Sequence, residues 1–219
     1  MIGRIRQYAG THGVRATALQ ALRRLRRGVV ADDRMTVMAK DLDGIAELRK
    51  PTGVRLEELD SSHLAGLAML NRKRRRKRAN RRFQSNLDRG LHGFVGLQGN
   101  EIVTYYWWVE AERSECHPDL EWLGAAVQFA PGDVYGSDFY VLPEYRAEGT
   151  ANEMLFLIET ALRDRGFKRV WGYVEAGNSG ARWLYSSRGY RPMGEVTVRK
   201  LLFHRRTTPA PPVGSPAHE

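Results

Sequence analysis

The sequence predicts an α/β fold, and three observations carry that prediction. Short segments with alternating apolar residues, typical of strands, recur from residue 54 onward. The later segments 150–165 and 179–188 instead repeat their apolar residues at helical spacing. Residues 132–190 run in the order strand, turn, helix, strand, helix, which places two helices among the strands of one sheet.

The first half of this region predicts three strands and a helix. Residues 54–59 alternate as the first strand, and Asp60 or Ser61 can cap the helix that follows. Residues 94–97 and 102–109 are the next two strands, joined by a hairpin turn. Tyr105–Trp108 is dense in aromatic residues, so its side chains either enter the core or line a pocket for an acceptor.

The second half begins after an irregular segment, residues 111–131, that contains two prolines. Gly166 and Gly189 each follow a helical pattern, as glycines that end helices do. In order, we expect a strand at 132–142, a helix at 150–165, a strand at 169–175, a helix at 179–188 and one or two strands at 193–203.

The composition divides the chain into three parts. Residues 1–52 are expected to form a basic extension with an amphipathic helix, in which residues 34–40 could add a strand. Residues 53–206 are expected to form the main domain, and residues 207–219, rich in proline, a disordered tail. The arginine-rich helix at 14–27 either packs on its own domain or rests on an anionic membrane surface.

Charge and cysteine content limit the function classes. The net charge of +10 favours partners that carry phosphates or carboxylates, and the single cysteine, Cys116, excludes an internal disulfide. No apolar run reaches the ~20 residues of a membrane-spanning helix. We therefore expect a cytoplasmic protein, with a peripheral place on the inner membrane face as the alternative. The oligomeric state, including a homodimer, is left open.

A second cluster of basic residues spans residues 72–82. Three interpretations of this cluster are open. It can be a charged surface that only contacts solvent, it can attract an acidic acceptor or a lipid headgroup, or it can bind nucleic acid. Phe83 is the aromatic residue beside it, and such sparse aromatics argue against stacking on bases. Nucleic acid is thus the less favoured partner.

The turn after residue 142 has the features of a phosphate site. The amides of a helix's first turn lack internal partners, and the helix dipole adds positive potential there. Ala147, Gly149 and Ala151 are small enough to let a diphosphate approach these amides, and Arg146 supplies charge. Glu148 is unfavourable there unless it points to solvent.

This turn, Arg146-x-x-Gly149-x-Ala151, together with Asn178 and the sequence around Tyr185 and Gly189, resembles the Gcn5-related N-acetyltransferase (GNAT) superfamily. The resemblance implies a mostly antiparallel mixed sheet with helices on both faces and one splayed parallel pair of strands. It implies acetyl-CoA or another acyl-CoA as co-substrate. The six histidines are scattered along the chain, so we expect no metal site. The residues that the resemblance assigns to acyl-CoA are Phe139, Tyr140, Val141, Arg146, Ala147, Glu148, Gly149, Thr150, Ala151, Asn152, Asn178 and Tyr185.

The resemblance also implies catalytic roles. Tyr185 would protonate the leaving thiolate, since a thiol titrates near ~8.5 and a phenol near ~10. Asp138 is the first candidate for the base that takes the proton of an amine acceptor, with Glu175 and Glu110 as alternatives. Asn178 would cap its helix and bond the pantetheine or acyl region.

The function implied is direct transfer of an acetyl or short acyl group to a primary amine of a small or acidic acceptor. One alternative keeps this chemistry but acetylates a sugar or lipid-linked intermediate at a membrane surface. Another is a non-catalytic module that senses acyl-CoA or binds RNA through its basic residues.

Overall fold

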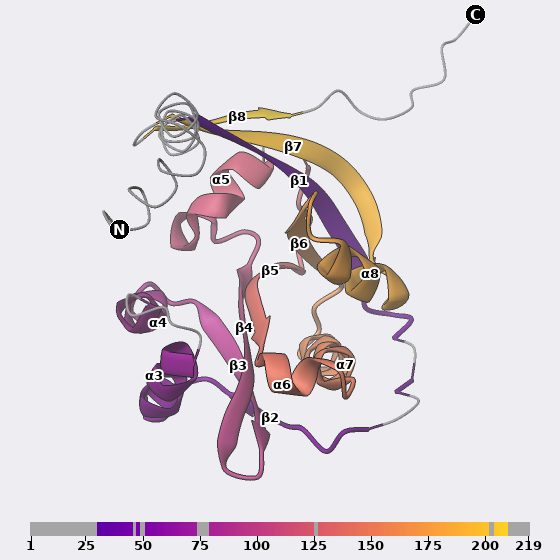
Figure 1. The fold of residues 1–219 in the computed structure, drawn as a ribbon. Coiled ribbons are helices and arrows are strands. Elements are labelled where there is room, and N and C mark those ends of the chain that lie inside the picture. The colour runs from indigo at the N-terminus through magenta and orange to yellow at the C-terminus, as the bar shows by residue number, and fades with distance from the viewer. Residues whose placement is uncertain are drawn as a thin grey trace, which may run out of the picture.

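The computed structural model of the chain describes residues 30–45, 47–48, 51–73, 79–124, 127–201 and 204–209. These residues form a mixed α/β structure around one eight-stranded sheet (Figure 1), as predicted. The strands are β1 (Val30–Asp41), β2 (Arg55–Glu58), β3 (His92–Gln98), β4 (Glu101–Glu110), β5 (Asp133–Val141), β6 (Arg169–Glu175), β7 (Arg191–Leu201) and β8 (His204–Pro209). The α-helices are α3 (Leu64–Lys73), α4 (Ala79–Asp88), α5 (Pro118–Gly124), α6 (Pro143–Arg146), α7 (Thr150–Asp164) and α8 (Ser179–Ser187).

The sheet has the order β2-β3-β4-β5-β6-β1-β7-β8, and its neighbours are antiparallel except for β5 and β6. These two strands pair in parallel only from Asp133↔Arg169 to Tyr135↔Trp171. Beyond that point β5 continues to Val141 and β6 to Glu175 without pairing to each other. The predicted splayed parallel pair is therefore present.

The strand β1 corrects the predicted domain boundary. It lies between β6 and β7, antiparallel to both, instead of in a separate extension that ends at residue 52. Met35, Val37 and Ala39 are buried against one core cluster, and Met38 against the other. A strand buried on both faces belongs to the interior of a sheet. The sheet thus begins at Val30, well before Gly53.

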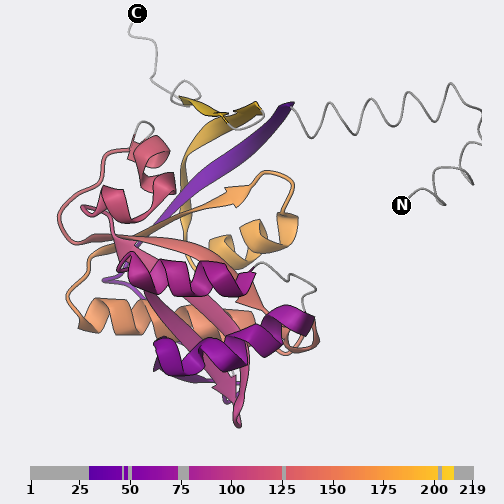
Figure 2. The ribbon, with the colours of Figure 1, turned by 90° about the vertical axis from the view of Figure 1, so that its left-hand side faces the viewer.

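The helices cover the two faces of the sheet in separate groups (Figures 1 and 2). α3, α4 and α5 lie on one face, and α7 and α8 lie on the other. Successive side chains of β4 point to opposite faces of the sheet, and each face has its own hydrophobic core. Tyr105 and Trp107 pack in the core covered by α3, α4 and α5, whereas Tyr106 and Trp108 pack in the core covered by α7. We call these two sides of the sheet the α5 face and the α8 face.

Several local signals predicted helix ends correctly. Gly166 and Gly189 have φ values of 87° and 85°, in the left-handed region that glycine adopts most easily. Asp60 accepts a hydrogen bond from Ser62 N and caps a short 3₁₀ turn (Ser61–His63) before α3.

Two further predictions differ from the structure. The segment expected to be irregular at 111–131 contains α5, and the segment expected to be a disordered tail from 207 begins within β8. The predicted basic helix at 14–27 and residues 210–219 lie outside the described residues. Within the part of the chain that is described, no helix combines the length and apolarity needed to cross a membrane.

Candidate active site

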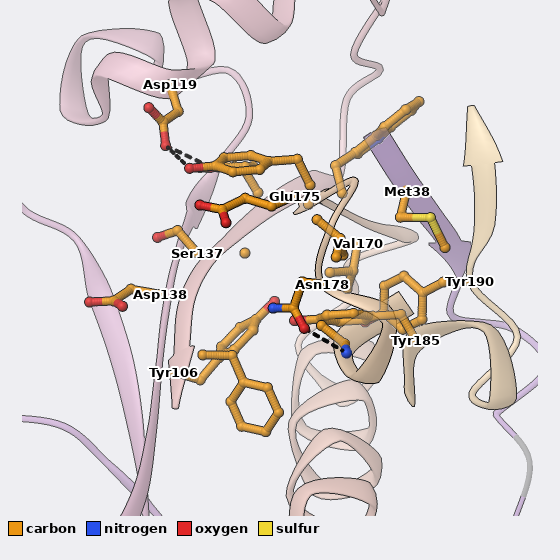
Figure 3. A pocket seen from close by; sticks show the side chains of 18 of the residues that line it. Met38, Tyr106, Asp119, Ser137, Asp138, Val170, Glu175, Asn178, Tyr185 and Tyr190 are labelled. Atoms are coloured by element: carbon orange, nitrogen blue, oxygen red, sulfur yellow. Dashed lines mark hydrogen bonds between the residues drawn. The ribbon is translucent and has the colours of Figure 1, made fainter. Parts of the chain in front are cut away.

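A cavity of about 410 Å³ opens where β5 and β6 diverge, and we call it the splay cavity (Figure 3). Its lining includes side chains of both faces of the sheet. Asp119, Tyr135 and Tyr173 line it from the α5 face, and Tyr106 and Tyr185 from the α8 face. The unpaired ends of β5 and β6 form its walls between them. The splay cavity therefore connects the two faces of the sheet.

Two glycines face each other at the point of divergence. Gly136 and Gly172 directly follow the last paired residues, and a Cβ built on Gly172 would lie 3.4 Å from Gly136 O. A Cβ on Gly136 would overlap the hydroxyl and Cζ of Tyr106. The absence of a side chain at Gly136 is thus what lets the Tyr106 ring reach the cavity. Burial raises the pKa of Tyr106 well above its ordinary value, so its hydroxyl keeps its proton.

Helix α8 supplies Tyr185. Asn178 caps this helix, as predicted, since its Oδ1 accepts a hydrogen bond of 3.1 Å from Ala181 N. The Tyr185 ring packs edge-on against Tyr190, with ring centroids 4.9 Å apart. Burial and, to a lesser degree, the charge of Glu159 raise the pKa of Tyr185. Its hydroxyl therefore stays protonated and can hydrogen-bond a leaving group, although full proton transfer from it is harder than from an exposed phenol.

Lys40, Glu159 and Arg188 are buried charged residues that contact one another, and we call them the ion triad. Glu159 of α7 is fully buried, and its Oε2 lies 2.6 Å from Lys40 Nζ of β1. The same oxygen accepts a hydrogen bond from Arg188 Nη2, at the end of α8. Desolvation lowers the pKa of Lys40, and the charge of Glu159 opposes this shift. The ion triad joins β1, α7 and α8, and so fixes the helix that carries Tyr185.

A second polar cluster lies on the α5 face. Oδ2 of Asp119 accepts hydrogen bonds from Tyr135 Oη at 3.1 Å and from Tyr173 Oη at 3.2 Å. Asp119 is 7% exposed, and it lines the splay cavity. Sequence reasoning missed this cluster because α5 was expected to be irregular. The available signal was Pro118 followed by Asp119, since proline at the first position and an acid in the first turn are common at helix starts.

The predicted base candidates lie in different environments. Asp138 has φ 44°, and the register of β4 against β5 shifts between Tyr105 and Trp107, so Asp138 lies in a β-bulge. Its Oδ2 accepts a hydrogen bond from Tyr105 Oη at 3.3 Å and lies 3.7 Å from Arg82 Nη1.

Of the two alternatives, Glu175 lines the splay cavity, and its side chain is exposed. The carboxylate of Glu110 instead lies 3.5 Å from His92 and 3.8 Å from Arg113. The structure therefore keeps Asp138 and Glu175 at the cavity and places Glu110 away from its lining.

The predicted phosphate turn joins β5 to α7. Gly149 has φ 92° and precedes the helix, and its carbonyl accepts the amides of Asn152 and Glu153. The amides of Thr150 and Ala151 belong to the first turn, where a helix has no internal acceptors. Ala147 has φ −71°, which an alanine adopts without strain.

The charged residues of this turn are arranged compatibly with an anion. Arg146 Nε donates to Val141 O at 2.9 Å, and its guanidinium lies 5.4 Å from the centre of the Tyr140 ring. Glu148 is exposed. Glu153 turns away, because its buried carboxylate accepts hydrogen bonds from Thr52 N at 2.7 Å and from the Thr52 hydroxyl. No carboxylate of the first turn is thus fixed in front of the outward amides.

The predicted site residues fall into two adjoining groups. Asp138, Phe139, Asn178 and Tyr185 line the splay cavity itself. Tyr140 and Val141 end β5, and the remaining predicted residues, 146–152, form the turn that leads into α7. Among the described residues, no three His, Cys, Asp or Glu side chains are grouped so that they could hold a metal ion.

A mixed sheet whose parallel strands diverge around a polar cavity, next to a helix that starts after a glycine, is the arrangement that the resemblance to the N-acetyltransferases implied. The chain matches the Acetyltransferase (GNAT) family over residues 56–190, and it belongs to that family.

Individual relatives agree with this membership. The chain is 30% identical to the uncharacterized N-acetyltransferase YycN of Bacillus subtilis (strain 168) over 124 residues, which are 54% of this chain and 70% of that protein. A functionally unknown conserved protein of Staphylococcus epidermidis ATCC 12228 matches in structure with a TM-score of 0.59 and 14% identity, over 82% of this chain and 66% of that one.

A second structural match is the GCN5-related glucosamine N-acetyltransferase region of a fungal multi-domain GH3 β-N-acetylglucosaminidase. It has a TM-score of 0.60 and 16% identity, and the match covers 82% of this chain but only 22% of the fungal enzyme. Because the sequence identities are so low, both structural matches show similarity of the fold alone.

Proposed function

We propose that this protein transfers an acetyl group from acetyl-CoA, or another short acyl group from its own acyl-CoA, to a primary amine, directly within a ternary complex. The observation that carries this proposal is the splay cavity, which connects the two faces of the sheet. A thioester held between β5 and β6 would present its sulfur to Tyr185 on the α8 face and its carbonyl carbon to an acceptor on the α5 face.

The donor half of the proposal rests on the turn from Arg146 to Asn152. Its outward amides, the dipole of α7 and the Arg146 guanidinium all favour a diphosphate. The unpaired edge of β5, Phe139 to Val141, offers backbone groups to an extended pantetheine arm, as an exposed sheet edge does for a peptide. Asn178 would reach the same arm from the start of α8.

The proposal that the acceptor is a primary amine rests on the charged side chains that line the splay cavity. Among the described residues that line the splay cavity, the carboxylates are Asp119, Asp138 and Glu175, and the basic side chain is Arg82. An excess of carboxylates in a partly enclosed cavity attracts a cation and disfavours an anion. A primary amine, protonated at neutral pH, fits this lining. The lining thus favours a cationic acceptor group over the acidic acceptor that the overall charge suggested.

Direct transfer is favoured over a covalent enzyme intermediate. Cys116, the one cysteine of the chain, is buried and is not among the residues that line the splay cavity. Burial raises the pKa of its thiol, which leaves little of the nucleophilic thiolate at neutral pH. The acyl group is therefore proposed to pass straight from the CoA sulfur to the amine nitrogen.

The experiment that tests this function measures thiol release from acetyl-CoA with a panel of amines. The panel contains an alkylamine, a diamine, a lysine peptide and glucosamine, the last because the fungal structural match is described as a glucosamine N-acetyltransferase region. We expect amine-dependent thiol release and a product heavier by one acetyl group. No binding of CoA or acetyl-CoA in calorimetry would contradict the proposal. Salt-sensitive RNA binding without turnover would favour the basic-module alternative instead.

A further inference from the structure

We propose that the Tyr106 hydroxyl donates a hydrogen bond to the carbonyl oxygen of the thioester, in the bound acyl-CoA and during acyl transfer. This inference rests on the proposed function and adds a second phenol to it, with a task different from that of Tyr185. It follows from where the hydroxyl lies along β5, from how the ring is held and from the chemistry of an acyl group.

The hydroxyl of Tyr106 lies at the apex of the splay cavity, the point next to Gly136 and Gly172 where β5 and β6 diverge. A Cβ built on Gly136 would overlap this hydroxyl, so the oxygen occupies the place of the missing side chain. Figure 3 shows the Tyr106 ring reaching into the cavity. The hydroxyl therefore lies beside the wall that β5 forms at its last paired residues.

The proposed acyl donor would extend toward this apex. The unpaired edge Phe139–Val141 lies between the phosphate turn, residues 146–152, and Gly136 along the chain. Gly136 is three residues from Phe139, or about 10 Å at the ~3.3 Å rise of a strand residue. An extended arm that starts at the diphosphate and pairs with Phe139–Val141 thus carries its acyl group toward Gly136.

An acetyl group offers one hydrogen-bond acceptor, its carbonyl oxygen, besides the sulfur to which it is bound. The sulfur is assigned to Tyr185, so a second donor at the acyl end of the cavity meets the carbonyl oxygen. When an amine adds to the carbonyl carbon, this oxygen gains negative charge. A donor that is already in place stabilises the charged oxygen more than the neutral carbonyl, and therefore accelerates the reaction.

The Tyr106 ring is held in this place by its surroundings. It is 2% exposed and packs edge-on against Phe139, with ring centroids 5.9 Å apart. Within the described part of the chain, no protein group forms a hydrogen bond with its hydroxyl. Buried hydroxyls usually have a hydrogen-bond partner, and a bound molecule that brings an oxygen to the apex would supply one.

The two phenols that line the cavity from the α5 face use their protons differently. Tyr135 Oη and Tyr173 Oη donate to Asp119 Oδ2 at 3.1 and 3.2 Å. A hydroxyl has one proton to donate, so each would have to leave this carboxylate in order to bind a carbonyl oxygen. Tyr106 can bind the carbonyl oxygen without breaking a hydrogen bond to a described residue.

Tyr106 keeps its proton while the bonds of the acyl group change. The nitrogen lone pair forms the C–N bond, and the π pair of the carbonyl moves to the oxygen that Tyr106 contacts. That pair then re-forms the carbonyl, and the C–S bond breaks with its electron pair going to sulfur. The ammonium acceptor gives up two protons in all, of which one ends on the CoA thiol and the other in solution.

The test compares the infrared carbonyl stretch of acetyl-CoA bound to wild type and to Tyr106→Phe. The stretch is isolated as the difference between acetyl-CoA with and without a heavy-isotope label at the carbonyl carbon. A hydrogen bond to the oxygen weakens the C=O bond, so we expect a lower frequency in wild type than in the variant. The measurement needs no acceptor and is therefore independent of turnover.

Three further measurements on Tyr106→Phe accompany the spectrum. We expect kcat to fall by ~10²-fold or more, as it does when one donor to an oxyanion is removed. The dissociation constant of CoA, which lacks the thioester carbonyl, should be unchanged. The free energy of unfolding should not fall, because the lost hydroxyl has no hydrogen-bond partner among the described residues.

Tyr190→Phe is the matched control, because Tyr190 is also a buried phenol that lines the cavity from the α8 face. Its ring packs against Tyr185, and Lys40 Nζ lies 5.8 Å from its centre. The carbonyl stretch in this variant should match that in wild type.

Equal stretches in wild type and Tyr106→Phe, or equal kcat values, would overturn the role of Tyr106 and leave the proposed function standing. A shifted stretch in Tyr190→Phe alone would overturn it as well. So would a clear loss of stability in Tyr106→Phe, since the hydroxyl would then have a partner within the protein. If wild type binds no acetyl-CoA, both proposals fail. If it binds acetyl-CoA but acetylates no amine, the proposed function fails, while the infrared comparison still decides whether Tyr106 contacts the carbonyl.

Discussion

The Tyr106 hydroxyl lies in the space that a side chain on Gly136 would fill. A Cβ built on Gly136 would overlap the hydroxyl and Cζ of Tyr106 and would lie 3.2 Å from its Cε2. Tyr106 is 2% exposed, so its ring has little room to move aside. Gly136 comes directly after the last paired residue of β5, and its small size therefore sets the shape of the splay cavity at its apex.

We predict that Gly136→Ala lowers both stability and turnover. The added methyl group must displace the Tyr106 ring or the β5 backbone, and such overpacking costs about 1–3 kcal/mol of unfolding free energy. A displacement of about 1 Å at the reacting centre can cost ~10²-fold in rate. Chemical unfolding and thiol release measure the two effects. Gly172→Ala is the control, since its Cβ would make an ordinary contact of 3.4 Å with Gly136 O; equal effects of the two substitutions would contradict this reading.

The sequence predicted the region from 132 to 190 well because its signals are local. The glycines at 149, 166 and 189 mark turns that need a positive φ, and each has one. The helix and strand periods between them are strong, so β5, α7, β6 and α8 lie within a few residues of their predicted bounds.

Features that depend on contacts between residues far apart in the chain could not be predicted from the sequence, because no local pattern indicates which residues meet. Nothing in residues 30–41 shows that their partners are β6 and β7, more than a hundred residues later. The ion triad likewise joins Lys40 to Glu159 and Arg188, which are single charged residues on three separate elements. Asp119 was not among the predicted site residues, because α5 is a short helix that starts with proline and its sequence resembles that of a loop.

Tyr185→Phe is predicted to leave acetyl-CoA binding intact and to lower turnover by ~10²-fold or more. The phenyl ring keeps the packing against Tyr190, and only the hydroxyl that would face the leaving sulfur is lost. Calorimetry with acetyl-CoA and thiol-release kinetics separate the two effects. Turnover equal to that of wild type would remove Tyr185 from the mechanism and would direct attention to Tyr106 and Tyr190, whose buried phenols also line the cavity from the α8 face and also have raised pKa values.

Gly149→Ala tests the phosphate turn. Gly149 has φ 92°, and an alanine there costs about 1–2 kcal/mol of unfolding free energy because its Cβ crowds the neighbouring carbonyl. We also expect weaker CoA binding, since the strained turn would move the first amides of α7.

Gly166→Ala is the matched control for this substitution, because Gly166 has φ 87° at the opposite end of the same helix with open space around it. Its stability should fall by a similar amount, and its CoA affinity should not change. Similar CoA affinities of the two variants, measured by calorimetry, would refute the assignment of the phosphate turn.

The ion triad should be the most sensitive electrostatic feature of the fold. Glu159→Gln removes the carboxylate that pairs with both Lys40 and Arg188, and loss of one partner from a buried ion pair costs about 3–5 kcal/mol. Lys40→Met should cost less, because it leaves Glu159 paired with Arg188. Asp164→Asn is the control, since its pair with Arg163 is exposed and should contribute less than ~0.5 kcal/mol.

Stability should also depend on pH through Lys40. Burial lowers the pKa of Lys40 below its ordinary value of 10.5, so between the two pKa values the unfolded chain binds more protons at this residue than the folded chain. The contribution of Lys40 to the free energy of unfolding therefore rises with pH through that window and levels off above 10.5. Chemical unfolding of wild type and Lys40→Met over this range isolates the contribution, because their difference should change with pH in favour of wild type. A difference that is constant with pH would show that Lys40 has the same pKa in both states.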